Sequence, residues 1–129
     1  MKVISIKQPY ASLIAYGYKE YEFRKWKTNY RGTIYIHASK EIDKEAMEKY
    51  KELNIEYKTG CIIAKAKLTN CIEINDDFKT YIKPKNNYPF VYNNVLSKNN
   101  NKYAFELKNI EFIEPIYIKG QLGIWNYNK

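Results

Sequence analysis

Three charged residues in the pattern Lys-x-x-Glu-x-Arg are the strongest candidates for chemistry in this chain: Lys19, Glu22 and Arg24. In a partly dry cleft, Lys19 and Glu22 could act as an acid–base pair, while Arg24 or Arg31 holds developing negative charge. The alternative is an ion pair that only holds the shape of a pocket, since a buried charge is costly unless it is paired. The sequence leaves both interpretations open.

Aromatic and basic residues around this pattern suggest a second chemistry, the binding of nucleic acid. An exposed aromatic ring can stack a base while lysine and arginine hold phosphates. Tyr10, Trp26 or Trp125 could provide the ring; Trp26 stands among charged residues and is the better candidate for exposure, whereas Trp125 fits core packing better. The predicted basic surface consists of Lys7, Lys19, Arg24, Lys25, Lys27, Arg31, Lys65, Lys67 and Lys119.

Composition sets the class of protein and of partner. The chain has 129 residues, of which 45% are hydrophobic, which predicts one folded domain spanning residues 1–129. Lys plus Arg number 22 against 14 Asp plus Glu, so the net charge is +8. Such an excess favours polyanionic partners, RNA or another nucleic acid, because each phosphate that is neutralised releases counterions. A lysine-rich surface can also serve solvation alone.

The remaining composition argues against membrane, disulfide and metal chemistry. No sustained apolar run is present, so we expect a cytoplasmic protein without a membrane partner. Cys61 and Cys71 lie in apolar, strand-like sequence and are predicted to be small core residues. With His37 as the single histidine, no metal site and no cofactor are predicted. For His37 itself a hydrogen-bonded structural role is favoured over catalysis. The oligomeric state is not indicated.

The first half of the chain predicts strands and two helices. Residues 2–7 alternate as a buried strand, and residues 9–16 have helical spacing that ends at Gly17. Gln8 stands at the cap position without being a favoured cap, which leaves its amide free for a ligand. Residues 18–24 alternate like a strand. A regular strand would place Lys19 and Glu22 on opposite faces, so their convergence requires irregular backbone near Glu20.

Further strands and a second helix follow. Residues 32–38 alternate as a strand, and Ser39 is predicted to cap a helix over residues 40–53. Residues 60–69 predict a strand with one solvent-exposed, basic face and a bend near Asn70. Strand alternation returns at 103–107, continues to Phe112 after a turn near Asn109, and ends in a short strand at 116–118.

Between these strands the asparagine-rich residues 75–102 predict loops, which either lie over a binding face or are inert. The whole pattern predicts an α+β fold, a small, partly closed β-barrel with two flanking helices.

Four segments in the right order resemble the ASCH domain family of the PUA-like superfamily: SIKQPYASLIAYGYKEYEFRKWKTNYRGTIYIHAS, GCIIAKAKL, YAFEL and PIYIKGQLGIWN. The resemblance implies a cleft beside the first helix that acts on RNA or other nucleic acid, as a binding module or an enzyme. The residues matched to the family's cleft and neighbouring segments are Gln8, Pro9, Tyr10, Lys19, Glu22, Arg24, Trp26, Arg31, Lys119 and Gln121.

One small bacterial branch of that family hydrolyses an acetylated cytidine nucleoside with a lysine, a threonine three residues later and a distant glutamate. Lys19 matches the lysine, but Glu22 stands where the threonine would be, and a carboxylate cannot replace a hydroxyl nucleophile. Glu73, Asp76 and Asp77 are equal candidates for the distant carboxylate. The sequence therefore favours a nucleic-acid-binding protein, with hydrolysis of a modified nucleoside or an RNA phosphodiester by Lys19 and Glu22 as the alternative.

Overall fold

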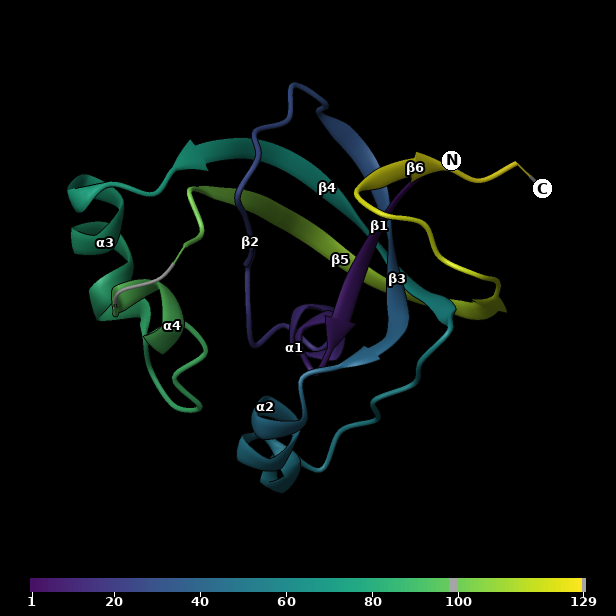
Figure 1. Cartoon of the computed structure of the whole chain (residues 1–129), viewed down its shortest axis with the longest axis horizontal. Helices are drawn as coiled ribbons and strands as arrows, with labels where there is room; N and C mark the ends of the chain where they lie inside the picture. Colours follow the sequence, from purple (N-terminus) through teal and green to yellow (C-terminus); the bar gives the residue numbers. More distant parts are fainter. Residues whose placement is uncertain (98–99, 129) are drawn as a thin grey trace.

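Six strands form one mixed sheet in the computed structural model, which describes residues 1–97 and 100–128. The sheet order is β2-β5-β4-β3-β1-β6, with β1 parallel to β3 and all other neighbours antiparallel (Figure 1). One mixed sheet with several helices confirms the α+β prediction. Among the described residues no backbone hydrogen bonds join the two edge strands, so the predicted partly closed barrel is not confirmed. The strands are β1 (Lys2–Gln8), β2 (Tyr21–Arg24), β3 (Gly32–Ile42), β4 (Cys61–Glu73), β5 (Tyr103–Tyr117) and β6 (Ile124–Asn126).

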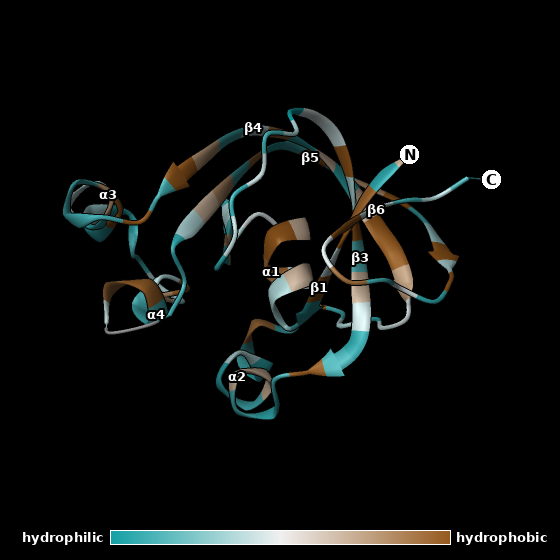
Figure 2. Cartoon of the chain, turned by 45° about the horizontal axis from the view of Figure 1, so that its top comes forward, coloured by the Kyte–Doolittle hydropathy of each residue, from teal (hydrophilic) through white to brown (hydrophobic). Residues whose placement is uncertain are grey.

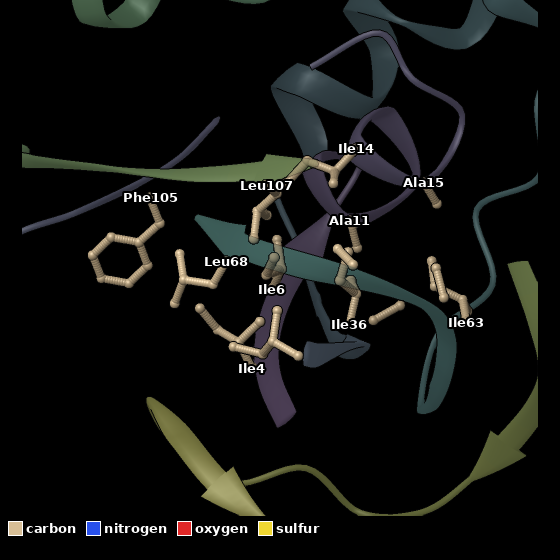
Figure 3. Packing of buried hydrophobic residues seen from close by; sticks show 14 of the residues in the cluster. Ile4, Ile6, Ala11, Ile14, Ala15, Ile36, Ile63, Leu68, Phe105 and Leu107 are labelled. Carbon is tan, nitrogen blue, oxygen red and sulfur yellow. The ribbon is translucent and has the colours of Figure 1, made fainter. Parts of the chain in front are cut away.

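A short helix fills the concave side of this sheet. Figure 2 shows α1 inside the arch formed by β4 and β5, and Figure 3 shows its apolar side chains directed at the strands. Ala11, Ile14 and Ala15 pack with Ile6 and Leu107 in one buried cluster. The helices are α1 (Tyr10–Ala15), α2 (Lys44–Lys49), α3 (Asp76–Ile82) and α4 (Asn93–Leu96), with 3₁₀ turns η1 (Lys51–Leu53) and η2 (Lys83–Lys85). Within the described residues, no helix is long and apolar enough to span a membrane.

Gln8 anchors the start of α1. Its Oε1 accepts from the backbone N–H of Ser12 at 2.9 Å, and its Nε2 donates to Ser12 Oγ and to the Lys58 carbonyl, both at 2.7 Å. Gln8 is fully buried, and both of its amide hydrogens are therefore used. The expectation of a free amide is wrong. The helix itself ends as predicted, before Gly17 with its left-handed φ of 86°.

The asparagine-rich stretch is built differently from its prediction as loops. Asn75 caps α3 by accepting from the Phe78 N–H at 2.9 Å, the role in which asparagine favours a helix start. Phe78, Ile82 and Val95 are buried in a second cluster together with Tyr21 of β2 and Leu13 of α1. These residues cover the sheet. Residues 98–99 of the predicted loop region, and residue 129, lie outside the described residues.

Two element boundaries in the structure also differ from those predicted from the sequence. β3 continues to Ile42, so Ser39 lies in a strand, and Asp43 caps α2 by accepting from the Ala46 N–H at 3.1 Å. β5 runs without a break through Asn109, whose φ of 55° places it at an irregularity of the ladder with β4. The bend predicted near Asn70 is present as a shift of register in β4.

Candidate functional site at the seam between β2 and β1

The gap between two strand edges is bridged by side chains. β6 pairs with β1 only at residues 2–4, which leaves the later part of β1 free at this edge. The Arg24 Nη2 atom, from β2, donates to the Ser5 carbonyl in β1 at 2.6 Å. A guanidinium therefore makes the connection that backbone hydrogen bonds would make in a closed barrel. We call the residues that fill this gap, Ser5, Tyr10, Lys19, Glu22 and Arg24, the seam.

Lys19 reaches the seam from an irregular turn. The N–H groups of Tyr18 and Lys19 both donate to the Leu13 carbonyl, at 2.8 and 3.1 Å, and β2 begins only at Tyr21. The predicted strand from residue 18 is therefore too long. The predicted irregularity before β2 is confirmed, and with it the convergence: Lys19 Nζ lies 3.5 Å from Glu22 Oε1.

Lys19 is buried between two aromatic rings. The residue is 4% exposed, and Nζ lies 5.0 Å from the ring centroid of Tyr10 and 4.7 Å from that of Phe23. Burial lowers the pKa of Lys19 below its ordinary 10.5, Glu22 opposes this shift, and Arg24 adds to it. Ring faces and one carboxylate replace the water that an ammonium normally holds.

Glu22 links the two cations. Its Oε1 faces Lys19, while Oε2 accepts from Arg24 Nε at 2.9 Å and lies 2.9 Å from Nη2. Two positive groups and one negative group leave one excess positive charge. Among the described residues, the contacts of Arg24 use Nε and Nη2, so Nη1 remains as a donor on a side chain that is 19% exposed. The seam thus presents one oriented cation toward solvent.

Tyr10 is fixed by the helix that follows β3. Its hydroxyl donates to Asp43 Oδ2 at 2.8 Å, and the other oxygen of Asp43 caps α2. Burial first, and then this contact, raise the pKa of Tyr10 far above its ordinary value. Hydrogen bonding to the Ala46 N–H is the main cause that lowers the pKa of Asp43. Tyr10 is accordingly a neutral phenol that forms a rigid wall.

Trp26 stands at the solvent side of the seam. It is 37% exposed, its ring packs edge-on against Phe105 at 5.1 Å, and the Arg24 guanidinium lies 5.8 Å from the ring centroid. Gly123 approaches from the loop before β6, where a Cβ would lie 3.9 Å from Trp26 Cζ2. The predicted exposure of Trp26 is confirmed. So is the core position of Trp125, which is 6% exposed and donates from Nε1 to Ser5 Oγ.

Of the other residues predicted to bind nucleic acid, some lie near Trp26 and the rest make contacts elsewhere. Lys119 and Gln121 are exposed in the loop that brings Gly123 to Trp26. Lys7 pairs with Glu41 at 3.7 Å. Arg31 donates to the carbonyls of its own loop, at residues 28 and 30. Gln8 is occupied by the α1 anchor, so nothing in the structure supports its predicted role in binding nucleic acid.

Two lysines of the predicted basic surface face elsewhere. Lys65 and Lys67 alternate along β4 with the buried Ala64, Ala66 and Leu68, so they point away from α1. Lys65 also pairs with Glu111 at 3.2 Å. The structure therefore does not unite all nine predicted basic residues on one surface.

His37 has the structural role that the sequence favoured. It is 1% exposed, and its Nε2 lies 2.7 Å from the Ile118 carbonyl, which can only accept, so Nε2 carries the proton. Gly120 covers the other side of the ring: a Cβ there would lie 2.7 Å from Nδ1. His37 thus holds the loop after β5 in place, which local sequence cannot reveal.

The three carboxylates proposed as the distant partner of Lys19 lie away from the seam. Glu73 ends β4 and Asp76 and Asp77 begin α3, and within the described residues none of the three contacts Lys19. No group of three His, Cys, Asp or Glu residues in that part of the chain could hold a metal ion. Sequence reasoning missed Ser5 and Asp43. Asp43 could have been found as the cap of a helix that starts at Lys44.

Comparisons with known proteins agree with this fold. Residues 4–118 match the sequence model of the ASCH domain. Activating signal cointegrator 1 from Homo sapiens is 27% identical over 135 aligned positions, which cover 95% of this chain and 21% of the human protein. The chain thus spans about a fifth of that relative's length.

Solved structures of an ASCH protein from Zymomonas mobilis are also similar. One has a TM-score of 0.57 and 21% identity, and the match covers 89% of this chain and 71% of that chain. A variant of the same protein has a TM-score of 0.58, with 91% and 73% covered. At this identity the likeness concerns the fold.

Proposed function

Because this chain belongs to the ASCH domain family, we propose that it binds nucleic acid, specifically single-stranded RNA or a modified nucleotide, at the solvent side of the seam. The observation that carries this proposal is the exposed indole of Trp26 beside Arg24, whose guanidinium is held by Glu22 and Ser5. An exposed ring stacks a base, and an adjacent fixed guanidinium binds a phosphate or a base carbonyl. The two groups together fit one nucleotide.

The buried part of the seam supports the binding in a different way. Lys19 is too buried to touch an RNA, but through Glu22 it helps to fix the orientation of Arg24. A pre-oriented guanidinium loses less conformational entropy when it binds. In this proposal Lys19 and Glu22 are positioning residues, and Lys25, Lys27 and Lys119 attract the phosphate backbone from the exposed surface.

Binding of a short labelled single-stranded RNA, followed by fluorescence anisotropy, tests the proposal. Trp26→Ala removes the stacking ring, and we expect a loss of about 1–3 kcal/mol, or roughly 5- to 150-fold weaker binding. Tyr88→Ala, which removes another exposed ring far along the chain, is the matched control and should bind like wild type. Equal losses in both variants, or no binding even at low salt, would reject the proposal.

A charge series adds a second test of the same surface. Lys119→Ala should weaken RNA binding and lessen its salt dependence, because one phosphate contact is lost. Lys67→Ala removes a lysine on the side of the sheet that faces away from α1 and should change binding less. If Lys67→Ala has the larger effect, the RNA lies on the other side of the sheet.

Hydrolysis of an acylated cytidine or an RNA phosphodiester is the second candidate. The specific observation in its favour is a buried lysine of lowered pKa, 3.5 Å from a carboxylate. Glu22 would then act as base to a water while Arg24 holds developing negative charge. Both oxygens of Glu22 are already engaged by cations, which makes binding the better supported function. Turnover by wild type that disappears in Lys19→Met and Glu22→Gln, in variants that still fold, would establish the enzyme.

A further inference from the structure

A second candidate site involves other residues of α1 and its C-cap, Ser12 and Tyr16. There, a surface cavity of about 330 Å³ is formed between α1, the segment after η1 and β5. None of its lining residues belongs to the seam. We call it the bulge cavity, and the residues that matter for its chemistry are Tyr16, Glu56, Lys58, Ile63, Phe112 and Glu114.

A wide irregularity in the sheet creates this cavity. In the β4–β5 ladder, Ile62 is opposite Ile116 and Ala64 is opposite Phe112. One residue of β4, Ile63, therefore faces three residues of β5, 113–115, and all four line the cavity. The third of them is a proline, which has no N–H to offer the ladder and is suited to a bulge. Bulges of this kind redirect side chains and are common beside functional sites.

Two aromatic rings stand at the edge of the cavity. Tyr16 and Phe112 contact each other edge to face, with centroids 4.8 Å apart. Nevertheless they are 38% and 55% exposed, so this apolar surface is not used by the fold. The Tyr16 hydroxyl accepts from the Glu56 N–H at 3.3 Å, which ties the ring to the segment after η1. The cavity therefore offers ring surface in a fixed position.

The charges of the cavity are opposite in sign to those of the whole chain. Lys58 pairs with Glu56 at 3.4 Å, whereas Glu114 has no ion pair among the described residues. Two carboxylates against one ammonium leave an excess negative charge, on a chain of net charge +8. A carboxylate beside exposed rings attracts a cation, since ring faces are themselves electrostatically negative.

The walls are held by buried hydrogen bonds and do not need a ligand to form. Ser12, inside α1, donates from Oγ to the Glu56 carbonyl at 2.7 Å. Gln8 donates to the Lys58 carbonyl at the same distance. A preformed cavity loses little entropy when it is filled, and this volume is at the lower end of the range for small-molecule sites.

We propose that the bulge cavity binds an organic cation carried on an apolar body, with the apolar body against Tyr16 and Phe112 and the cation at Glu114. Two sources share this chemistry: a free small amine, or an arginine or lysine side chain of another protein that lies next to an apolar residue. The proposal is independent of RNA binding, because its residues lie outside the seam.

Titration of the full chain, followed by the amide chemical shifts of residues 12–16, 112–114 and 116, tests this site. The probes are benzylammonium, its neutral counterpart benzyl alcohol, and the capped dipeptide N-acetyl-phenylalanyl-arginine amide. We expect the cation to bind about fivefold more tightly than the alcohol at low salt. Glu114→Gln should abolish that difference, and Phe112→Ala should weaken both probes. Tyr88→Ala, an exposed ring elsewhere, should leave both unchanged.

Each result bears on the proposal. Tighter binding of the dipeptide than of benzylammonium would support the proposal with a protein side chain as the ligand, and the reverse order would support it with a free amine. Equal affinity for the cation and the alcohol, shift changes that avoid both segments, or a cation preference that survives Glu114→Gln would overturn it. RNA titrated into Phe112→Ala separates the two sites, because RNA binding should not change.

Discussion

The seam and the bulge cavity are formed by different residues around α1, and they use similar residue types in opposite ways. Both combine an aromatic side chain, a lysine and at least one carboxylate, and both depend on irregular backbone. In the seam, Lys19 and Glu22 are 4% and 7% exposed, and every charge is paired. At the cavity, the charged residues are exposed and Glu114 is left without an ion pair in the described part of the chain.

The difference is one of desolvation. A charge that has lost its water depends on its protein partner, whereas an exposed charge keeps its water whether or not a partner is present. The seam should therefore respond to substitution mainly through stability. The cavity should respond mainly through binding. Four substitutions test this contrast.

Glu22→Gln should have the largest effect. It leaves Lys19 and Arg24 buried or half-buried without a counter-charge, and breaking a buried pair in this way typically costs about 3–5 kcal/mol. Urea unfolding at neutral pH measures the change in the free energy of unfolding. A loss below about 1 kcal/mol would mean that the seam behaves as an exposed ion pair.

Lys19→Met should cost less, about 1–2 kcal/mol, because Glu22 keeps Arg24 as its partner and the methionine still packs between Tyr10 and Phe23. Urea unfolding at neutral pH measures the difference. If the free energy of unfolding falls as much as in Glu22→Gln, the ion pair with Arg24 alone is not sufficient to stabilise the buried Glu22 carboxylate.

The pH dependence of stability in the same variant reports the protonation of Lys19. Burial lowers its pKa in the folded state below 10.5, so between the two pKa values the unfolded chain binds more protons. The contribution of this group to stability therefore rises with pH and is complete only above 10.5. From neutral pH upward, wild type should gain stability relative to Lys19→Met. Parallel curves would show that the folded-state pKa is ordinary.

Phe112→Ala should cost about 1 kcal/mol, from the lost edge-to-face contact with Tyr16 and a side chain that is already 55% exposed. Thermal unfolding and the chemical shifts of residues 12–16 measure the two consequences. A loss of several kcal/mol would mean that the ring belongs to the core and is not free for a ligand.

Glu114→Gln should change stability least, by no more than about 0.5 kcal/mol in either direction, because the carboxylate is solvated. Its effect should be confined to the binding of cations. Clear destabilisation in urea would contradict the contrast with Glu22, since it would reveal a partner on which the fold depends.

Particular residues show which features of the fold could be predicted from the sequence and which could not. Alternation predicted the buried and exposed faces of β4 correctly from Ala64 to Leu68, because a strand has a period of two. It failed at Ile62, which packs with Trp125 in another cluster, because the ladder is irregular between Ile62 and Ala64. The full use of the Gln8 amide was not predictable, since one of its acceptors, the Lys58 carbonyl, lies 50 residues away in the sequence. Asn75 was misinterpreted because asparagine favours both turns and helix caps, and only the packing of Phe78 and Ile82 decides between them.

For the candidate site, too, some features could be predicted from the sequence and others could not. The sequence by itself determined the family, the α+β class, the pattern of Lys19, Glu22 and Arg24, and the need for irregular backbone before β2. Only the tertiary structure decided that Arg24 reaches Ser5 across the seam, and that three residues of β5 face one residue of β4 at the cavity. The physical reason is that periodicity and helix capping act between near neighbours, whereas the desolvation of a charge depends on strands that are distant in sequence.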